Sequence, residues 1–332
     1  MLWAWGEFLL CSAAIGFAGY RLARYGDVIA GVSGVSGTWV GIVLLATVTS
    51  LPELVTGIAS VTVIDAPDIA VGDVMGSCVF NLLLIAVLDF FHRETPVYLK
   101  AGQGHILSAA FSIVLLGIVV FSQLAGATAA LPIGHVGIYS PTIIALYVVA
   151  VRAIYVHERR THTVLDDAAT RGGMDLQRAI VGYLGSAAVV VAAGIAMPHA
   201  AVRLASVMGW GQSFVGTLLV AGATSLPEAA STLGALKIRA IDLAFGSLLG
   251  SNLFNVVVLA IDDFAYTKGP LLAHASSSHV LTAVSAIIMT GIAVIGLHYR
   301  PAMRIFRIAG WVSLGLLTIY ILNSLVLYLR GH

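Results

Sequence analysis

Charged residues are scarce in this chain. Asp, Glu, Lys and Arg make up 10% of its 332 residues, and the formal net charge is +1. Soluble domains carry about 25% charged residues, so this scarcity excludes an ordinary water-soluble protein. The lack of a basic excess argues against a nucleic-acid partner, which would need a positive patch to contact phosphates. The only two cysteines, Cys11 and Cys78, lie in apolar segments and indicate neither a disulfide framework nor a zinc site.

Long hydrophobic runs are abundant instead. Hydrophobic residues make up 59% of the chain, and the mean hydropathy is +0.98. A helix needs roughly 20 apolar residues to cross a bilayer core of about 30 Å. Ten runs approach or exceed this length, and they fall near residues 2–20, 29–63, 68–90, 104–122, 136–156, 179–197, 204–236, 242–262, 278–297 and 306–329. The sequence therefore predicts an all-α polytopic membrane protein with ten transmembrane helices.

The ten runs form two groups of five. We expect a first five-helix unit over 1–156, a polar cytoplasmic linker over 157–178 and a second five-helix unit over 179–332. Because Lys and Arg concentrate in cytoplasmic loops, their distribution predicts both termini outside. An odd number of crossings per unit then makes the second unit inverted. No positive residue precedes the first run, so we expect a first membrane helix rather than a removable signal peptide.

A polar pentapeptide occurs twice, inside the second apolar run of each group. Thr-Ser-Leu-Pro-Glu spans 49–53 and again 224–228. A carboxylate at membrane depth costs a few kcal/mol or more, and such residues mark ion or substrate pathways. Each of these two runs is too long for one straight crossing, so we expect a helix that is broken at mid-membrane. The repeat continues in the next helices, where Ser77 and Asn81 match Ser251 and Asn255.

These positions offer oxygen atoms and little else. Pro52 and Pro227 have no N–H to donate to the carbonyls of Val48 and Ala223, so those carbonyls are expected to be free. Oxygen ligands with two negative charges suit a hard cation such as Ca²⁺. The candidate ligands are Glu53, Glu228, Thr49, Ser50, Thr224, Ser225, Ser77, Asn81, Ser251 and Asn255, with Asp73 and the carbonyls of Val48 and Ala223 as possible additions.

Simpler explanations exist for several of these residues. A single Ser or Thr near a proline is usually only a helix kink, and the doubled motif could instead form a buried polar network that joins the halves. Asp73 could be an extra ligand or a proton site, although its counterpart is Ser247. Asp68 and Asp242 open their helices and are expected to be N-caps.

The two motifs and the following Gly-Ser segments carry a family resemblance. Residues 49–53 with 76–81, and residues 222–228 with 250–255, resemble the two alpha repeats of the sodium/calcium exchanger family, within the calcium/cation antiporter superfamily. The resemblance implies alternating access around a central site where Glu53 and Glu228 bind calcium and sodium in competition. Many relatives have Gly where Val48 and Ala223 stand, and an acidic residue at one of the two Asn positions.

The sequence thus predicts a secondary antiporter that exchanges calcium for sodium. The alternative is a divalent cation/proton antiporter that uses the same carboxylates. We expect no enzymatic activity and no cofactor, because no zinc-protease or nucleophile-elbow motif is present. The partners are the transported ions and the lipid bilayer, and the expected location is a prokaryotic inner membrane with N- and C-termini outside.

Overall fold

The computed structural model describes residues 1–32, 46–92, 95–129, 133–161, 175–301, 304–305 and 309–330. The described chain is mostly helical. Its longer helices are α1 (Leu2–Val32), α4 (Pro67–Phe91), α5 (His105–Ala129), α6 (Tyr139–Thr161), α7 (Leu176–Met208), α11 (Ile241–Ala265), α13 (His279–Tyr299) and α14 (Trp311–Arg330). Each contains a segment long and apolar enough to cross a membrane.

Shorter helical pieces make up the two segments that carry the repeated pentapeptide. They are α3 (Leu51–Ala59) and the π-helix η1 (Ser60–Ile64) in the first half, and α8 (Gln212–Phe214), the π-helix η3 (Val215–Val220), α9 (Ala221–Thr224) and α10 (Leu226–Lys237) in the second. Other short elements are η2 (Val97–Leu99), α12 (Leu271–His274) and the paired strands β1 (Arg304–Ile305) and β2 (Ala309–Gly310).

Two predicted boundaries were wrong. Helix α1 continues to Val32, well past the predicted end at residue 20, and α7 continues to Met208, past the predicted end at residue 197. The apolar run ends where polar residues begin, but Arg and Ala are good helix formers, so the backbone stays helical beyond it. Helix α6 ends at Thr161 and α7 begins at Leu176, both within the segment 157–178, whose role as a linker stays a prediction. Residues 33–45, within the predicted second run, lie outside the described residues.

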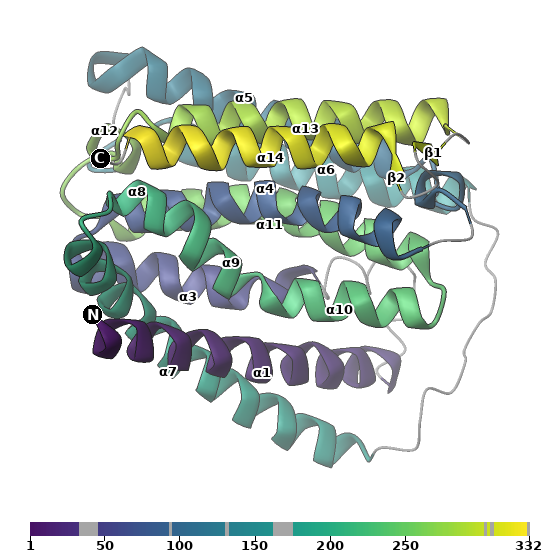
Figure 1. Cartoon of the computed structure of the whole chain (residues 1–332), viewed down its shortest axis with the longest axis horizontal. Coiled ribbons are helices and arrows are strands. Elements are labelled where there is room, and N and C mark those ends of the chain that lie inside the picture. The colour runs from purple at the N-terminus through teal and green to yellow at the C-terminus, as the bar shows by residue number, and fades with distance from the viewer. Residues whose placement is uncertain are drawn as a thin grey trace.

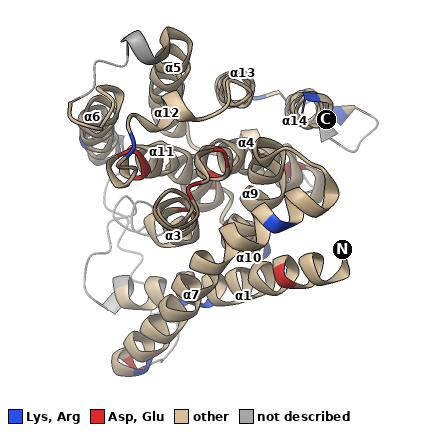
Figure 2. Cartoon of the chain, turned by 90° about the vertical axis from the view of Figure 1, so that its left-hand side faces the viewer, with Lys and Arg blue, Asp and Glu red and all other residues tan. Residues whose placement is uncertain are grey.

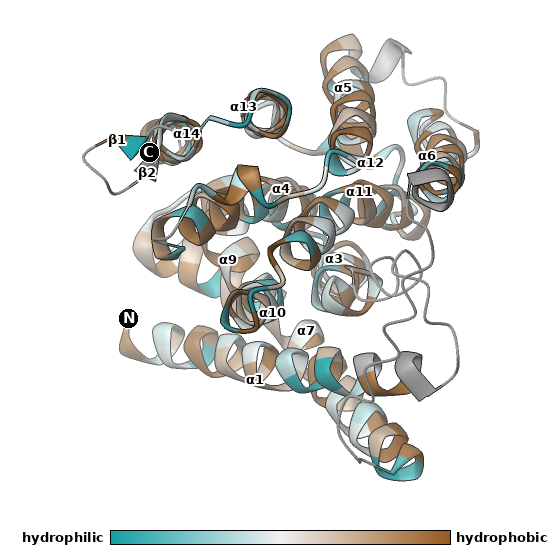
Figure 3. Cartoon of the chain, turned by 90° about the vertical axis from the view of Figure 1, so that its right-hand side faces the viewer, coloured by the Kyte–Doolittle hydropathy of each residue, from teal (hydrophilic) through white to brown (hydrophobic). Residues whose placement is uncertain are grey.

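The helices run roughly parallel or antiparallel, and α4 and α11 occupy the centre (Figure 1). Helices α1 and α7 lie together on one side, and α5, α6, α13 and α14 lie on the other. Both termini lie at the same end of the bundle. Charged residues occupy little of the ribbon (Figure 2), and hydrophobic residues line most helices (Figure 3). This distribution is that of a membrane protein, whose outer surface faces lipid.

Two glycines let α1 and α7 approach the pentapeptide segments closely. A Cβ atom at Gly19 of α1 would lie 2.2 Å from Pro227 Cγ, and one at Gly194 of α7 would lie 2.8 Å from Val55 Cγ1. Gly19 and Gly194 occupy equivalent positions of the two halves, because they are separated by the same offset as the two pentapeptides. Each glycine therefore packs on the pentapeptide helix of the other half.

Aspartates at the start of α4 and α11 bind histidines of the opposite half. Asp68 Oδ1 lies 2.9 Å from His279 Nε2, and Asp242 Oδ1 lies 2.8 Å from His105 Nε2. The residues at the N-cap positions are Ala66 and Ala240, so the N-cap prediction was wrong. Each aspartate instead links its helix to the first turn of a helix from the other half. The sequence could not indicate this, because the partners are distant along the chain.

Asp263, near the end of α11, accepts hydrogen bonds from the start of α6. The donors are Gly137 N (2.9 Å), Tyr139 OH (2.6 Å) and Ser140 Oγ (2.6 Å), and Leu271 N adds a fourth bond of 2.6 Å. With four donors, this buried carboxylate is fully hydrogen-bonded. It joins the central helix of the second half to the last helix of the first.

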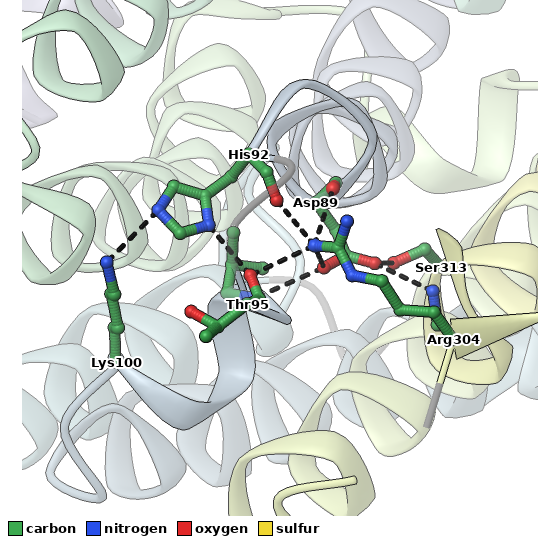
Figure 4. A network of polar contacts seen from close by, with 8 residues as sticks. Asp89, His92, Thr95, Lys100, Arg304 and Ser313 are labelled. Carbon is green, nitrogen blue, oxygen red and sulfur yellow. Dashed lines mark hydrogen bonds and ion pairs between the residues drawn. The ribbon is translucent and has the colours of Figure 1, made fainter. Parts of the chain in front are cut away.

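Asp89, the counterpart of Asp263, makes the reverse connection at the end of α4. It accepts hydrogen bonds from Gly310 N (2.9 Å), Ser313 Oγ (2.7 Å) and Val97 N (3.1 Å). The guanidinium of Arg304 lies beside it and donates to the nearby backbone carbonyls, as Figure 4 shows. Contacts that exchange the roles of the two halves are what a two-fold relation produces.

Candidate ion-binding site

Each pentapeptide places its serine between two helical segments. Ser50 precedes α3 with φ −86° and ψ 12°, and Ser225 lies between α9 and α10 with φ −83° and ψ 9°. A proline follows two residues later in each case, at the start of the next helix, where a missing N–H costs nothing. Neither serine side chain caps its own helix. Both hydroxyls are therefore available for contacts with other segments.

These hydroxyls connect the two pentapeptides to each other. Ser50 Oγ donates to Glu228 Oε1 at 3.3 Å, and Ser225 Oγ lies 3.2 Å from Glu53 Oε1. Each serine thus contacts the glutamate of the other motif. Both glutamates lie in the first turn of their helices, α3 and α10, and both are fully buried. The structure brings together two carboxylates that lie in opposite halves of the sequence.

One oxygen of each glutamate has no hydrogen-bond partner among the described residues. Glu53 Oε2 and Glu228 Oε2 are buried and accept no hydrogen bond from the residues that the structure describes. Burying an ionised carboxylate without compensation is expensive. A proton or a bound cation would remove that cost at each position.

The central helices α4 and α11 add hydroxyls to the same region. Ser77 Oγ of α4 lies 3.3 Å from Glu53 Oε1 and 3.0 Å from Ser225 Oγ. Ser251 Oγ of α11 lies 3.4 Å from Thr49 Oγ1. All of these side chains are completely buried. A network of polar groups from both halves, in several hydrogen-bonded sets, therefore surrounds Glu53 and Glu228 where α3, α4, α10 and α11 meet.

Asp73 of α4 joins this network through the second pentapeptide. Thr224 Oγ1 donates to Asp73 Oδ1 at 2.7 Å, whereas Asp73 Oδ2 has no hydrogen-bond partner in the described chain. Asp73 is fully buried, and its counterpart Ser247 offers only a hydroxyl. The network is thus more acidic on one side than on the other.

Asn81 is oriented by a residue that the sequence analysis did not single out. Asn252 Nδ2 donates to the carbonyl of Cys78 at 3.1 Å, and Asn252 Oδ1 accepts from Asn81 Nδ2 at 3.0 Å. Because the Cys78 carbonyl can only accept, the nitrogen of the Asn252 amide must face it, and the oxygen of Asn252 then faces the nitrogen of Asn81. The orientation of both amide groups is thereby fixed. Asn81 Oδ1 is left without a donor among the described residues. The only sequence signal was that Asn252 stands where the first half has Cys78.

Asn255 differs from its counterpart Asn81. Neither its Oδ1 nor its Nδ2 has a hydrogen-bond partner within the described residues, although the side chain is fully buried. At the C-terminus of α9, the backbone N–H of Ser225 donates to the carbonyl of Ala221 at 3.0 Å, and Pro227 has no N–H to donate to the carbonyl of Ala223, which stays a predicted possible ligand. Val48 lies in the helical residues just before Ser50.

The donor set resembles what hard cations prefer. Among the described residues, no three His, Cys, Asp or Glu side chains form a metal-binding group. A cation here would depend on the two glutamates together with hydroxyl and amide oxygens, a combination typical of Ca²⁺ or Na⁺ and not of zinc or copper.

Comparisons with known proteins identify the family of this chain. The family model described as sodium/calcium exchanger protein matches residues 3–156 and 178–329. The chain belongs to the sodium/calcium exchanger family. The two matched stretches are the two halves, so the chain contains two repeats, and the resemblance predicted from the motifs is confirmed. The family is one of membrane antiporters, not of enzymes.

Inner membrane protein YrbG of Escherichia coli (strain K12) is 25% identical over 281 residues, covering 80% of this chain and 82% of that protein.

Solved structures of exchangers share the fold. The H⁺/Ca²⁺ exchanger CAX has a TM-score of 0.69 and 12% identity, covering 99% of this chain and 86% of that chain. The sodium-calcium exchanger NCX_Mj has a TM-score of 0.61 and 21% identity, covering 97% of each chain. Since these identities are low, the similarity concerns the fold, and exchangers with different coupling ions adopt it.

Proposed function

We propose that this exchanger moves calcium in exchange for sodium by alternating access at the network around Glu53 and Glu228. The reciprocal contacts Ser50–Glu228 and Ser225–Glu53 carry the proposal. They give each buried carboxylate a hydroxyl from the other pentapeptide, and the second oxygen of each carboxylate has no hydrogen-bond partner among the described residues. Two carboxylates can balance one Ca²⁺ or, in competition, Na⁺ ions. An empty, doubly negative site would be costly to carry across the membrane, which would enforce exchange.

The proposed ligands are those that the sequence indicated. Glu53 and Glu228 supply the charge, and the hydroxyl and amide oxygens complete the coordination. These neutral donors are Thr49, Ser50, Ser77, Asn81, Thr224, Ser225, Ser251 and Asn255. Asp73 is a possible further ligand, because one of its oxygens is unpartnered among the described residues.

We further propose ten crossings arranged as two inverted repeats, with the pentapeptide segments crossing as helices broken at Ser50 and Ser225. The reciprocal aspartate contacts support the two-fold relation, and the helix interruptions support the break. Both termini would lie outside a prokaryotic inner membrane, as the Lys and Arg distribution predicts. Expelling one Ca²⁺ against 100 mV costs about 4.6 kcal/mol, at roughly 2.3 kcal/mol per charge, so additional inward Na⁺ would have to supply it.

Exchange of a divalent cation for protons is the second candidate. Asp73 favours it, because this third buried carboxylate contacts the network through Thr224, and its counterpart in the second repeat, Ser247, carries no carboxylate. The fold similarity to the H⁺/Ca²⁺ exchanger CAX is compatible with this mode.

Calcium flux in proteoliposomes tests both candidates, with sodium, potassium or proton gradients imposed one at a time. A sodium gradient should drive calcium movement, and Glu53→Gln and Glu228→Gln should each abolish it, because each removes one of the two balancing charges. Glu7→Gln is the matched control, since Glu7 is partly exposed and pairs with Arg203. Drive by protons alone would favour the second candidate. Wild-type flux in both glutamine variants would exclude this site for either mode.

A further inference from the structure

Asp262 is a buried carboxylate outside the proposed ion site. It lies on α11, three residues before the helix ends, and has no exposed surface. Neither Oδ1 nor Oδ2 has a hydrogen-bond partner in the part of the chain that the structure describes. The adjacent Asp263 differs completely, because four donors surround it. Asp263 joins α11 to α6 through its hydrogen bonds. Asp262 makes no such bonds within the described residues, so a structural role of this kind does not account for its burial.

A glycine of α3 makes room for this carboxylate. A Cβ atom at Gly57 would lie 2.3 Å from Asp262 Oδ2 and 2.6 Å from Oδ1. Gly57 follows Glu53 by one helical turn on α3, and Asp262 shares a face of α11 with Asn255. The carboxylate therefore lies in the α3–α11 interface that also carries the proposed ion site. At 1.5 Å per residue, Asp262 is about 10 Å beyond Asn255 along α11.

At the end of α11, described basic groups have other partners: His135 Nε2 contacts the carbonyl of Phe264, and Lys268 pairs with Asp65. No ion pair joins Asp262 to a Lys, Arg or His within the described residues. The groups that interact with it electrostatically are acidic, namely Asp263 on α11 and Asp73 on α4. On the other helices packed against α11, Glu53 of α3 and Glu228 of α10 belong to the ion site, and His105 of α5 is bonded to Asp242 at the opposite end of α11.

An isolated ionised carboxylate in such surroundings is very costly. Asp262 therefore needs a proton or a cation. A proton requires only one carboxylate oxygen, whereas Ca²⁺ takes six to eight oxygen ligands. The ion site gathers two carboxylates with several hydroxyls, whereas no described hydroxyl or amide group is hydrogen-bonded to Asp262, so the proton fits better.

The buried carboxylate and the glycine beside it have no chemical equivalents at the matching positions of the other repeat. The counterpart of Asp262 in the first repeat is Leu88, which is also buried, and the counterpart of Gly57 in the second repeat is Thr232. The inserted carboxylate and the glycine that accommodates it thus occur on one side of the central site only, toward the end of α11.

We infer that Asp262 is a proton-binding site that makes cation exchange depend on the pH at the membrane face where α11 ends. The inference rests on the proposed antiport function and adds a regulatory proton to it. At low pH on that face, Asp262 is neutral. At higher pH it releases its proton to water as a cation enters the α3–α11 interface, and the resulting anion attracts that cation toward Glu53. The apparent calcium affinity at that face therefore rises with pH.

Calcium exchange in proteoliposomes tests this when the pH is varied on one side at a time. In the wild type, the calcium affinity at the α11-end face should increase severalfold from mildly acidic to mildly alkaline pH. Asp262→Asn should keep the low affinity at every pH on that face and retain the pH dependence on the other face. Asp262→Ser provides a second neutral variant if the first one does not fold. Gly57→Ala should shift the same pH dependence, whereas Gly291→Ala, which has open space around it, should not.

Unchanged pH dependence in both neutral variants would overturn the inference and leave the antiport intact. An equal loss of rate at every pH would also overturn it, because that is the mark of a structural residue. If the wild type shows no exchange at all, the proposed function fails, and infrared spectroscopy still tests Asp262. A protonated-carboxyl C=O band that disappears in Asp262→Asn would support proton binding, and an identical spectrum would refute it.

Discussion

Asn81 and Asn255 occupy equivalent positions but have different surroundings. Asn252 holds the amide of Asn81 so that its oxygen is the atom left open, and Cys78 provides no equivalent side-chain amide for Asn255. An orientated ligand loses less freedom when a cation binds, because its geometry is already set. The first repeat therefore offers a better prepared amide ligand than the second.

We predict that Asn252→Ala weakens calcium binding by roughly tenfold or more, the usual effect of removing a residue that orients a metal ligand. The expected cause is free rotation of the Asn81 amide, since its hydrogen-bond partner is lost. Isothermal titration of calcium into purified protein measures this effect. Asn323→Ala on α14 is the matched control, because Asn323 is also buried and lies on a helix outside the network. Equal affinities for both variants would show that Asn252 does not position Asn81.

Among the helices, four aspartates join the repeats in reciprocal pairs. Asp89 and Asp263 each accept backbone and hydroxyl hydrogen bonds at the start of the last helix of the opposite repeat. Asp68 and Asp242 do the same with histidines at the starts of α13 and α5. These bonds hold the two central helices against the surrounding ones, so they position the helices that carry the proposed site.

Asp263→Asn should destabilise the protein by about 2 to 3 kcal/mol, because charge-assisted hydrogen bonds are lost and an amide N–H₂ faces N–H and O–H donors. Asp89→Asn should act in the same direction. Thermal unfolding in detergent measures both. An unchanged unfolding temperature for Asp263→Asn would show that these bonds contribute little to stability.

Asp65→Asn is the surface control for that experiment. The hydrogen bond and charge of Lys268 lower the pKa of Asp65 below its ordinary value, and both side chains are largely exposed. A depressed pKa means that the pair stabilises the fold above the unfolded-state value of about 3.9, and that this contribution is lost as the pH falls through the lower folded-state value. Exposed pairs contribute little, so Asp65→Asn should unfold close to the wild-type temperature at neutral pH.

The packing of α1 predicts opposite effects for two glycines of that helix. Gly19→Ala should destabilise the protein by about 1 to 3 kcal/mol, because its Cβ would overlap the Pro227 ring. Gly6→Ala has nothing within 4 Å and should be neutral or slightly stabilising, as alanine is the better helix former. Thermal unfolding of both variants measures the difference. Equal stability would mean that α1 can move away from the second pentapeptide at no cost.

For the whole molecule, equivalent positions of the two repeats test the inverted arrangement. Val63 and Ile238 are such a pair, since they are separated by the same offset as the two pentapeptides, and both side chains are well exposed. In a background in which Cys11 and Cys78 are replaced by Ala, Val63→Cys and Ile238→Cys should react with an impermeant maleimide from opposite sides, with Ile238→Cys cytoplasmic. Labelling of both from the same side would show that the repeats are parallel.

The sequence predicted the fold class because its main determinants are local. Apolar length set the membrane helices, and the doubled Thr-Ser-Leu-Pro-Glu motif with its Ser and Asn companions indicated the family and the residues that the structure brings together. Helix ends were predicted less well, since α1 and α7 continue beyond their apolar runs. Hydropathy reports where lipid contact ends, whereas the backbone stays helical as long as its residues favour that conformation.

Only the tertiary structure decided which partner each polar side chain meets. Asp68 and Asp242 have the sequence position of N-caps, yet they bind histidines of the opposite repeat. Two adjacent aspartates, Asp262 and Asp263, have opposite surroundings, with no donor among the described residues at the first and four at the second. In both cases the deciding groups come from distant segments. The sequence determines the chemistry of each side chain, and the packing of the helices determines whether that chemistry is satisfied within the protein or left open for an ion or a proton.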